Sequence, residues 1–343
     1  MIQSSSEIKK KPVVKKITPK KEVLDILEQE QKIRPSKLDE MIGREQEKKT
    51  LKMMIDSAKK RKEVVDHILF YGPPGLGKTT FAMAIANEIG GSIRITSGPA
   101  IERQGDLAAI LTGLKRNDIL FIDEIHRLSR VVEEILYPAM EDGVLDIVMG
   151  KGPSAKTIRL SLEPFTLIGA TTQIGKISSP MRDRFGLVQR LDFFTSEDMG
   201  SILKRAANLW KIGIEDEALE KLSNCSRGTA RIGLRLLKRT RDYMENSSNT
   251  TINMDAVNQT LKLLDIDEYG LENIDRLILH TILNNFNGGP VGASTLAASL
   301  SEDVSTVADV YEPYLMKCGY LKRTSRGRVI TQKGLKYLED LNG

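Results

Sequence analysis

The stretch Gly72-Pro73-Pro74-Gly75-Leu76-Gly77-Lys78-Thr79 decides the fold, because it matches the phosphate-binding pattern G-x4-G-K-S/T. An apolar run at 67–71 precedes it and an amphipathic run at 79–89 follows it, so it joins a predicted strand to a predicted helix. Glycines let backbone N–H groups close around a phosphate, and the N-terminus of a helix adds partial positive charge. We therefore expect a nucleotide to contact Gly75, Gly77, Lys78, Thr79 and Thr80. Lys78 would reach the β- and γ-phosphates, and the Thr79 hydroxyl would ligate Mg²⁺.

Short apolar runs alternate with helical patterns from about residue 33 to residue 194. Besides the run at 67–71, such runs lie at 92–96, 118–122, 165–169 and 187–192. Strands separated by helices indicate βαβ units around a parallel sheet. Two further runs, Val144–Met149 and 157–162, flank Gly150-Lys151-Gly152-Pro153 and predict a β-hairpin inserted into this α/β domain.

The rest of the chain predicts two smaller domains. The pattern at about 195–265 is helical only. Residues 268–343 show three helical patterns, at about 271–286, 292–300 and 303–316, and then two strand-like runs around Ser325-Arg326-Gly327. This order is typical of a winged helix-turn-helix. The predicted domains are a basic disordered tail at 1–32, a nucleotide-binding domain at 33–194, a helical domain at 195–265 and a winged-helix domain at 268–343.

The charge of the chain is distributed unevenly. The formal net charge is +5, but the first 21 residues contain seven lysines and one acid, so the remaining chain is nearly neutral. The tail has too few apolar residues to offset the entropy of ordering it, and no apolar segment that would make it a secretory signal. No uncharged apolar run approaches the length of a membrane span. The two cysteines and three histidines form no local cluster typical of zinc. We expect a cytoplasmic protein that has no membrane partner.

A strand-like run at 118–122 ends in two acids, Asp123 and Glu124. Asp123 suits a Mg²⁺ ion, and Glu124 suits the general base that orients an attacking water. Alone, two acids after a strand would equally indicate a helix cap. Together with the upstream phosphate-binding pattern they favour hydrolysis of the nucleotide. His126 is expected to be a helix-start residue hydrogen-bonded near the site, not a catalytic base.

Polar residues follow two later elements of the α/β domain. Thr171 comes after the run at 165–169, where a hydroxyl could position the water and sense the γ-phosphate; the alternative is a plain residue at a strand end. Arg182 and Arg184 lie in a short surface segment. Two such arginines usually form a solvated face, but in a ring-forming ATPase one of them can enter the neighbour's site.

Eight linked motifs connect these features. They are residues 72–80, 96–99, 120–128, 150–154, 169–172, 182–186, 288–292 and 312–315. From Arg34 to about Thr331, the chain resembles the RuvB family, the bacterial Holliday-junction branch-migration motors of the AAA+ class. The resemblance implies an AAA+ ATPase domain with the inserted hairpin, a helical lid and a winged helix. It also implies a homohexameric ring that hydrolyses ATP with Mg²⁺ and moves duplex DNA at a four-way junction, with RuvA and the RuvC resolvase as partners.

The resemblance also assigns residues by matching motifs. Arg184 matches the family's trans-acting arginine finger, with Arg182 as the fallback, and Arg231 matches the second sensor arginine. Three positions match family nucleotide contacts, namely Ile33, Arg34 and Phe194. At the position of Phe194 the family usually has Tyr. The hairpin matches the RuvA docking surface, for which we choose Ile147 and Met149; the alternative is that these two pack back onto the sheet. Arg323 and Arg328 match DNA-contacting positions of the wing.

Three departures from the family pattern stand near these positions. Gln173 replaces a usual Arg, and Ala230 and Ser325 each replace a usual Pro. The first weakens a charge role after the paired threonines, and the second loosens the start of the sensor helix. None of the three replaces a residue of the phosphate-binding pattern or either of the paired acids.

Basic residues cluster in the winged-helix region although its net charge hides them. No acid lies between Pro313 and Leu338, where the bases are Lys317, Lys322, Arg323, Arg326, Arg328, Lys333 and Lys336. Such a cluster is typical of phosphate contacts with DNA, which do not read sequence; a solvated surface is the alternative. From this cluster we add Arg326 to the predicted DNA contacts.

Two other functions remain as alternatives. A replication-origin initiator also joins an AAA+ module to a winged helix, but the hairpin and the 288–292 stretch argue against it. A nucleotide-gated DNA-binding switch would need neither the water-activating Glu124 nor an arginine finger.

Overall fold

The computed structural model describes residues 33–149, 156–247 and 250–342. Its backbone divides into two units, Met1–Arg34 and Pro35–Gly343, and every element below belongs to the second. The predicted disordered tail at 1–32 lies outside the described residues.

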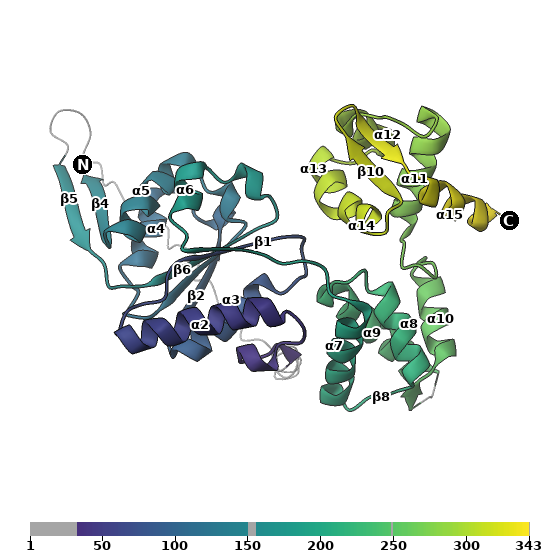
Figure 1. The fold of residues 1–343 in the computed structure, drawn as a ribbon, viewed down its shortest axis with the longest axis horizontal. Coiled ribbons are helices and arrows are strands. Elements are labelled where there is room, and N and C mark those ends of the chain that lie inside the picture. The colour runs from purple at the N-terminus through teal and green to yellow at the C-terminus, as the bar shows by residue number, and fades with distance from the viewer. Residues whose placement is uncertain (1–32, 150–155, 248–249, 343) are drawn as a thin grey trace, which may run out of the picture. The chain divides into compact units, whose positions relative to one another are not determined.

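A five-stranded parallel sheet forms the centre of the first domain (Figure 1). Its strands, in spatial order, are β2 (Ile93–Ser97), β3 (Ile119–Asp123), β6 (Thr166–Thr171), β1 (Ile68–Tyr71) and β7 (Leu187–Arg190). All neighbouring pairs are parallel. The sheet confirms the α/β fold predicted from the alternating runs.

Helices cover both faces of this sheet (Figure 1). One face carries α2 (Glu45–Arg61) and α3 (Lys78–Ile89), and the other carries α4 (Gln104–Leu111) and α5 (Arg130–Glu141). Successive strand residues point to opposite faces. Leu69 therefore joins the apolar cluster with α4 and α5, while Phe70 stacks on Phe81 of α3 with ring centroids 5.3 Å apart. Burial on both faces accounts for the almost uninterrupted apolar composition of the central strands.

The inserted hairpin follows directly after α5. It pairs β4 (Val144–Met149) with β5 (Lys156–Ser161) in an antiparallel ladder that is separate from the five-stranded sheet (Figure 1). The prediction of this hairpin is confirmed, with β5 shifted by one residue, whereas the predicted turn at 150–153 lies outside the described residues.

The lid domain is mainly helical, as predicted. Its helices are α7 (Ser196–Trp210), α8 (Asp216–Cys225), α9 (Ala230–Asn246) and α10 (Met254–Leu263). The structure adds a parallel pair, β8 (Gly213–Ile214) with β9 (Thr251–Ile252), which the sequence analysis missed. Strands of two residues are too short to show an alternating pattern.

The winged-helix domain has the predicted order of three helical regions and a ribbon. It begins with α11 (Asn273–Phe286) and α12 (Ala293–Leu300), and its ribbon is β10 (Leu321–Thr324) with β11 (Gly327–Ile330). The helix predicted at 303–316 is confirmed as one continuous helical segment, which consists of α13 (Val304–Thr306), the π-helical turn η6 (Val307–Tyr311) and α14 (Glu312–Lys317). Pro313 has no N–H to donate to the carbonyl four residues before it, which favours the π-helical turn at this place in the helix. A last helix, α15 (Gln332–Asn342), was not predicted.

Short elements complete the described chain. They are the helical turns η1 (Leu38–Glu40), η2 (Gly98–Ala100), η3 (Ile125–Arg127) and η5 (Ile174–Lys176), and the helix α6 (Ser179–Asp183). Within the described ranges, no helix is both long enough and apolar enough to cross a membrane.

Candidate nucleotide site and DNA-contacting wing

Three neighbouring strands deliver the predicted nucleotide-binding residues to one edge of the sheet. In the register of the sheet Tyr71 lies beside Thr171, and Ile122 lies beside Gly169. The phosphate-binding loop follows Tyr71, and the two acids follow Ile122. Parallel strands all end at the same edge, which is where open α/β sheets bind ligands.

The phosphate-binding loop has backbone angles that require glycine. Gly75 and Gly77 have φ of 81° and 90°, in the left-handed region. At Gly72, a Cβ atom would lie 2.3 Å from the carbonyl oxygen of Leu191, so no side chain fits there. The loop therefore keeps its N–H groups free of side-chain cover at the start of α3.

Lys78 is the first residue of α3 and is buried. Its Nζ donates to the carbonyl oxygens of Gly72 at 2.8 Å and Pro73 at 3.0 Å. Burial lowers the pKa of Lys78 to about 8, and the charges of Asp123 and Glu124 offset part of that shift. A buried ammonium held only by carbonyl oxygens is stabilised by an anion, so this loop fits a phosphate group.

The two acids stand where the β3 strand turns into η3. The Oδ1 atom of Asp123 accepts a hydrogen bond from the Glu124 N–H at 3.0 Å. Glu124 has a φ of 49°, a left-handed conformation that costs a non-glycine residue about 1–3 kcal/mol. Both side chains are half-buried, as is that of Thr79. Hydroxyl and carboxylate oxygens are suitable ligands for Mg²⁺, so the predicted pair Thr79 and Asp123 fits this ion.

His126 connects the acids to the end of β6. Its Nδ1 lies 2.8 Å from the Thr171 hydroxyl oxygen and 3.3 Å from Oε2 of Glu124. Burial lowers the pKa of His126, so the imidazole is neutral at pH 7. The expectation that His126 is hydrogen-bonded near the site is confirmed by its contact with Thr171.

The two threonines after β6 face different partners. Thr171 is completely buried, and its hydroxyl oxygen contacts His126 and accepts the Gln173 N–H at 2.9 Å. Thr172, which the sequence analysis passed over, has its hydroxyl 3.4 Å from Oε2 of Glu124. The pair of threonines was the signal in the sequence, but only the structure shows which one borders the acid. A direct role of Thr171 toward water or phosphate stays a prediction.

The lid contributes Arg231 from the first turn of α9. A Cβ atom on Gly75 would lie 2.9 Å from the Cβ of Arg231, so the phosphate-binding loop and the start of α9 are in contact. The charge of Arg231 is also among the causes that lower the pKa of Lys78. The structure thus brings the predicted sensor arginine to the loop.

Arg44 is a residue of this region that the sequence analysis missed. Its side chain is 6% exposed, with the guanidinium 4.3 Å from the ring centroid of Phe194, and it donates to the carbonyl oxygens of Leu76 at 3.3 Å and Asp192 at 2.7 Å. Phe194 is buried as well, so Arg44 connects the phosphate-binding loop to the predicted contact Phe194. No local pattern marks Arg44 in the sequence, because its partners lie far along the chain.

Two predicted nucleotide contacts cannot be placed against the site. Ile33 and Arg34 belong to the other structural unit, Met1–Arg34. Their contacts with nucleotide stay a prediction.

Arg184 is held by contacts within the chain. Its guanidinium donates to Oε2 of Glu141 at 2.9 Å and to the carbonyl oxygen of Pro180 at 2.7 Å, and lies 4.6 Å from the ring centroid of Tyr137. Its side chain is 27% exposed. These contacts place Arg184 at the end of α5, beside the start of the hairpin. Arg182 is half-buried on the short helix α6, which ends just before Arg184.

The wing arginines share a buried acid. Glu312 is completely buried at the start of α14, and it accepts from Nε of Arg323 at 2.6 Å and from Nε of Arg328 at 2.8 Å. The Arg323 side chain is 44% exposed and the Arg328 side chain 16% exposed. Arg326, in the turn of the wing, is exposed. Only Arg323 and Arg326 of the three predicted DNA contacts therefore present much of the side chain to solvent.

The hairpin residues chosen for partner binding are described only in their backbone. Ile147 pairs with Ile158, and Met149 pairs with Lys156, across the ladder. The side chains of Ile147 and Met149 lie outside the described residues. Ile158 is 44% exposed, so at least one apolar side chain of the hairpin faces solvent.

The departures from the family pattern have defined places. The Gln173 amide donates to the Asp309 carboxylate of η6. Ala230 is the first residue of α9, and Ser325 is exposed in the wing turn.

Comparisons with known proteins agree with this geometry. Three family models match the chain: the Holliday junction DNA helicase RuvB P-loop domain at 33–191, the RuvB AAA lid domain at 194–267 and the RuvB C-terminal winged helix domain at 268–339. The Holliday junction branch migration complex subunit RuvB of Clostridium kluyveri is 56% identical over 310 residues, which is 90% of this chain and 89% of that protein. The solved structure of the Thermotoga maritima RuvB Holliday junction branch migration motor has 50% identity and a TM-score of 0.82, covering 90% of this chain and 98% of that one. A lysine-to-arginine mutant of the same protein gives 50% identity and a TM-score of 0.83, with the same coverage.

Proposed function

Since the chain belongs to the RuvB family of AAA+ P-loop ATPases, we propose that it hydrolyses ATP to drive branch migration of Holliday junctions. The observation that carries this proposal is the meeting of Lys78, Asp123 and Glu124 at one edge of the sheet. A protein that only binds nucleotide needs the lysine, but a carboxylate beside the phosphate site is the group that orients an attacking water.

The residues divide the work of hydrolysis. Lys78 holds the β- and γ-phosphates. Glu124 accepts the proton of the attacking water, and His126 and Thr172 keep the Glu124 carboxylate in position. Mg²⁺, when held by Thr79 and Asp123, supplies charge neutralisation for the phosphates. Arg231 contacts the γ-phosphate from the lid.

We also propose that the subunits form a hexameric ring. Arg184 lies at the end of α5, and it would complete the site of the neighbouring subunit. One subunit that gives an arginine to the next requires head-to-tail contacts, which close into a ring.

The DNA and protein partners follow from the other two surfaces. The wing bases contact DNA phosphates without reading sequence, which suits a motor that moves along DNA. The hairpin binds RuvA, and the RuvC resolvase binds the same junction. Because the protein acts on chromosomal junctions, we expect it in the cytoplasm.

The test compares Glu124→Gln with wild type in ATP hydrolysis and in branch migration of a synthetic four-way junction, each with and without RuvA. We expect at least about a hundredfold loss of turnover, because a general base contributes that much, with ATP binding retained. Glu220→Gln, an exposed acid of α8, is the matched control and should behave as wild type.

Other outcomes would identify the alternatives. Wild-type protein that binds ATP and DNA but does not hydrolyse ATP would be a nucleotide-gated switch. Hydrolysis without movement of the junction, with RuvA present, would contradict the motor and leave an ATPase of another kind, such as an origin initiator.

A further inference from the structure

The turn that joins α8 to α9 lies next to two residues that are predicted to contact the nucleotide, Phe194 and Arg231. Arg227 and Gly228 are both left-handed, with φ of 56° and 66°, so the turn has one defined shape. The Gly228 carbonyl oxygen accepts the Phe194 N–H at 2.9 Å. Two residues after the turn's end at Thr229, Arg231 meets the phosphate-binding loop. A movement of this turn therefore reaches Phe194 and Arg231 together.

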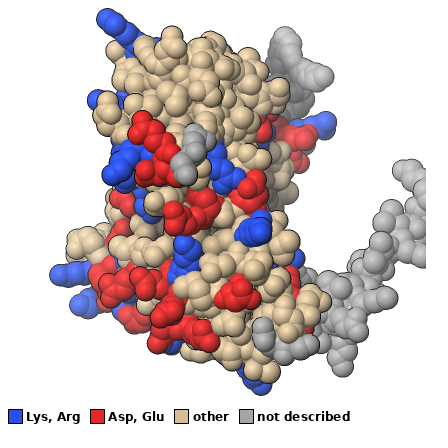
Figure 2. Space-filling model, turned by 90° about the vertical axis from the view of Figure 1, so that its right-hand side faces the viewer, with Lys and Arg blue, Asp and Glu red and all other residues tan. Residues whose placement is uncertain are grey.

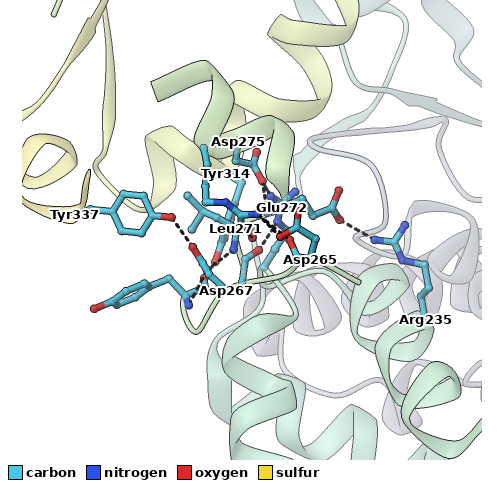
Figure 3. A network of polar contacts seen from close by, with 12 residues as sticks. Arg235, Asp265, Asp267, Leu271, Glu272, Asp275, Tyr314 and Tyr337 are labelled. Atoms are coloured by element: carbon cyan, nitrogen blue, oxygen red, sulfur yellow. Dashed lines mark hydrogen bonds and ion pairs between the residues drawn. The ribbon is translucent and has the colours of Figure 1, made fainter. Parts of the chain in front are cut away.

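The Arg227 side chain leaves this turn and enters the winged-helix domain. It is 6% exposed, and its Nε donates to the carbonyl oxygen of Gly270 at 2.9 Å. Its guanidinium lies 4.6 Å from the ring centroid of Tyr314 in α14 and forms an ion pair with Asp275 of α11. Figure 3 shows these two partners, Asp275 and Tyr314, close to each other.

Both partners of Arg227 are themselves fixed. Asp275 is completely buried, and its Oδ2 accepts the Glu272 N–H at 2.9 Å, which caps α11. The Tyr314 hydroxyl donates to the carbonyl oxygen of Tyr269 at 2.8 Å. Neither partner can follow Arg227 without moving its helix.

The helix α14 continues the connection to the wing. Tyr314 lies two residues after Glu312, the buried acid that holds Arg323 and Arg328. Lys317 of the same helix has its Nζ 4.6 Å from the ring centroid of Phe193, next to Phe194. One short helix thus touches the lid turn at one side and the predicted DNA contacts at the other.

We infer that Arg227 is a positioning residue that couples nucleotide binding at Arg231 to DNA binding at the wing. The inference rests on the proposed function, because that function supplies the two ligands, ATP and DNA. Separating a buried ion pair leaves an unpaired charge away from water, so the turn and α11 move as one body. A second ion pair, Arg235 with Glu272 at 2.9 Å, also joins the lid to the winged-helix domain (Figure 3). The Arg235 side chain is 56% exposed and the Glu272 side chain 32% exposed, so water can replace either partner.

The test measures the coupling factor, which is the ratio of the dissociation constants for a labelled DNA duplex without and with a non-hydrolysable ATP analogue. By linkage, DNA must change the affinity for the analogue by the same factor. In the wild-type full chain we expect a factor of at least about fivefold, the lower end for coupled sites.

Two variants remove the connection in different ways. In Arg227→Gln with Asp275→Asn no buried charge is left unpaired, so the protein should fold, bind the analogue alone and DNA alone as wild type does, and show a coupling factor near unity. Arg227→Lys keeps the charge but loses the planar stacking on Tyr314, and should give an intermediate factor. Arg235→Ala is the matched control and should keep the wild-type factor.

The outcomes separate the inference from the proposed function. Wild-type coupling in both Arg227 variants, or its absence in wild type that binds both ligands, would overturn the inference alone. Failure of the wild type to bind ATP or DNA would overturn the proposed function, and the inference with it. A simple loss of packing would lower the melting temperature and leave the factor unchanged, which would also count against the inference.

Discussion

At the scale of single residues, Lys78 makes nucleotide binding depend on pH. Its pKa in the folded protein, about 8, lies below the ordinary lysine value of 10.5. Between these values the unfolded chain binds more protons than the folded one, so the contribution of Lys78 to stability rises with pH. A bound phosphate has the opposite effect, because it favours the charged ammonium and raises the pKa.

ATP binding should therefore take up a proton near pH 8, and its affinity should fall as the pH rises above that value. Titration calorimetry in two buffers of different ionisation enthalpy measures this uptake. Equal binding heats in both buffers near pH 8 would contradict the prediction. At pH 6 the ammonium is already charged in the free protein, so Lys78 should take up no proton there, which is the internal control.

His126 should control turnover without controlling nucleotide affinity. It contacts Thr171 and Glu124 but none of the predicted phosphate-binding residues. Replacing it by alanine removes one hydrogen bond, worth about 1 kcal/mol, so we expect kcat to fall about fivefold with KM for ATP unchanged. Steady-state kinetics checks this, with His280→Ala of α11 as control. A rise in KM at constant kcat would show that His126 acts on binding instead.

At the scale of elements, the wing combines a structural role with the proposed DNA contact. Arg328 is largely buried on Glu312, so Arg328→Ala leaves a buried acid with one partner fewer and should cost about 3 kcal/mol of folding stability. Arg326 is exposed, so Arg326→Ala should leave the melting temperature unchanged and reduce the salt slope of DNA affinity by about one. Salt titrations and thermal melts of the two variants check this separation. Equal loss of stability in both would contradict it.

The hairpin should be needed for the partner and not for hydrolysis. Ile147→Glu, or Ile158→Glu at the paired position, places a charge on the proposed docking surface. We expect loss of RuvA in a pull-down with unchanged basal ATPase activity, because neither residue belongs to the nucleotide site. RuvA captured equally by both variants would rule out this surface.

The elements also show what a sequence can predict. The strands of the central sheet were predictable, because burial on both faces makes β1, β3 and β6 apolar. The hairpin was predictable, because residues of β4 and β5 alternate in character with a period of two. The π-helical turn η6 was not, because Tyr311 and its neighbours continue a helical pattern that only Pro313 interrupts.

The site shows the same division. Lys78, Asp123 and Glu124 belong to local patterns and were predicted. Arg44 contacts Asp192, which is 148 residues away, and the partners of Arg227 and of Arg328 also come from tertiary packing. Spacing in a sequence contains no information on such pairs.

At the scale of the whole molecule, the net positive charge belongs to the tail and not to the three folded domains. The excess of positive charge lies in the first 21 residues, and the rest of the chain is nearly neutral. Figure 2 shows acidic and basic side chains interspersed on one face, below a broad uncharged area. Within the rest of the chain, local contacts at the wing are therefore the proposed source of DNA binding, and its strength should depend on salt in proportion to those few contacts.

A ring with shared sites predicts complementation between two inactive variants. Glu124→Gln lacks the base and Arg184→Ala lacks the finger, so each alone should lose ATPase activity. In an equal mixture, a site with an intact base can receive an intact finger from its neighbour, and about a quarter of the wild-type rate should return. Turnover of the mixture against each variant alone is the measurement. No recovery in mixed rings would show that Arg184 acts within its own subunit.

If Arg184 is the finger of the proposed ring, its contact with Glu141 would give a lone subunit a resting state. With the Arg184 side chain bound to Glu141 and no neighbouring subunit to supply a second finger, a free subunit would hydrolyse little ATP. The pair is partly exposed and so holds by no more than about 1 kcal/mol, which a single new contact can outweigh. ATP hydrolysis in the cell would then begin when the ring assembles on a junction and stop when the ring dissociates. Unassembled subunits would consume little ATP.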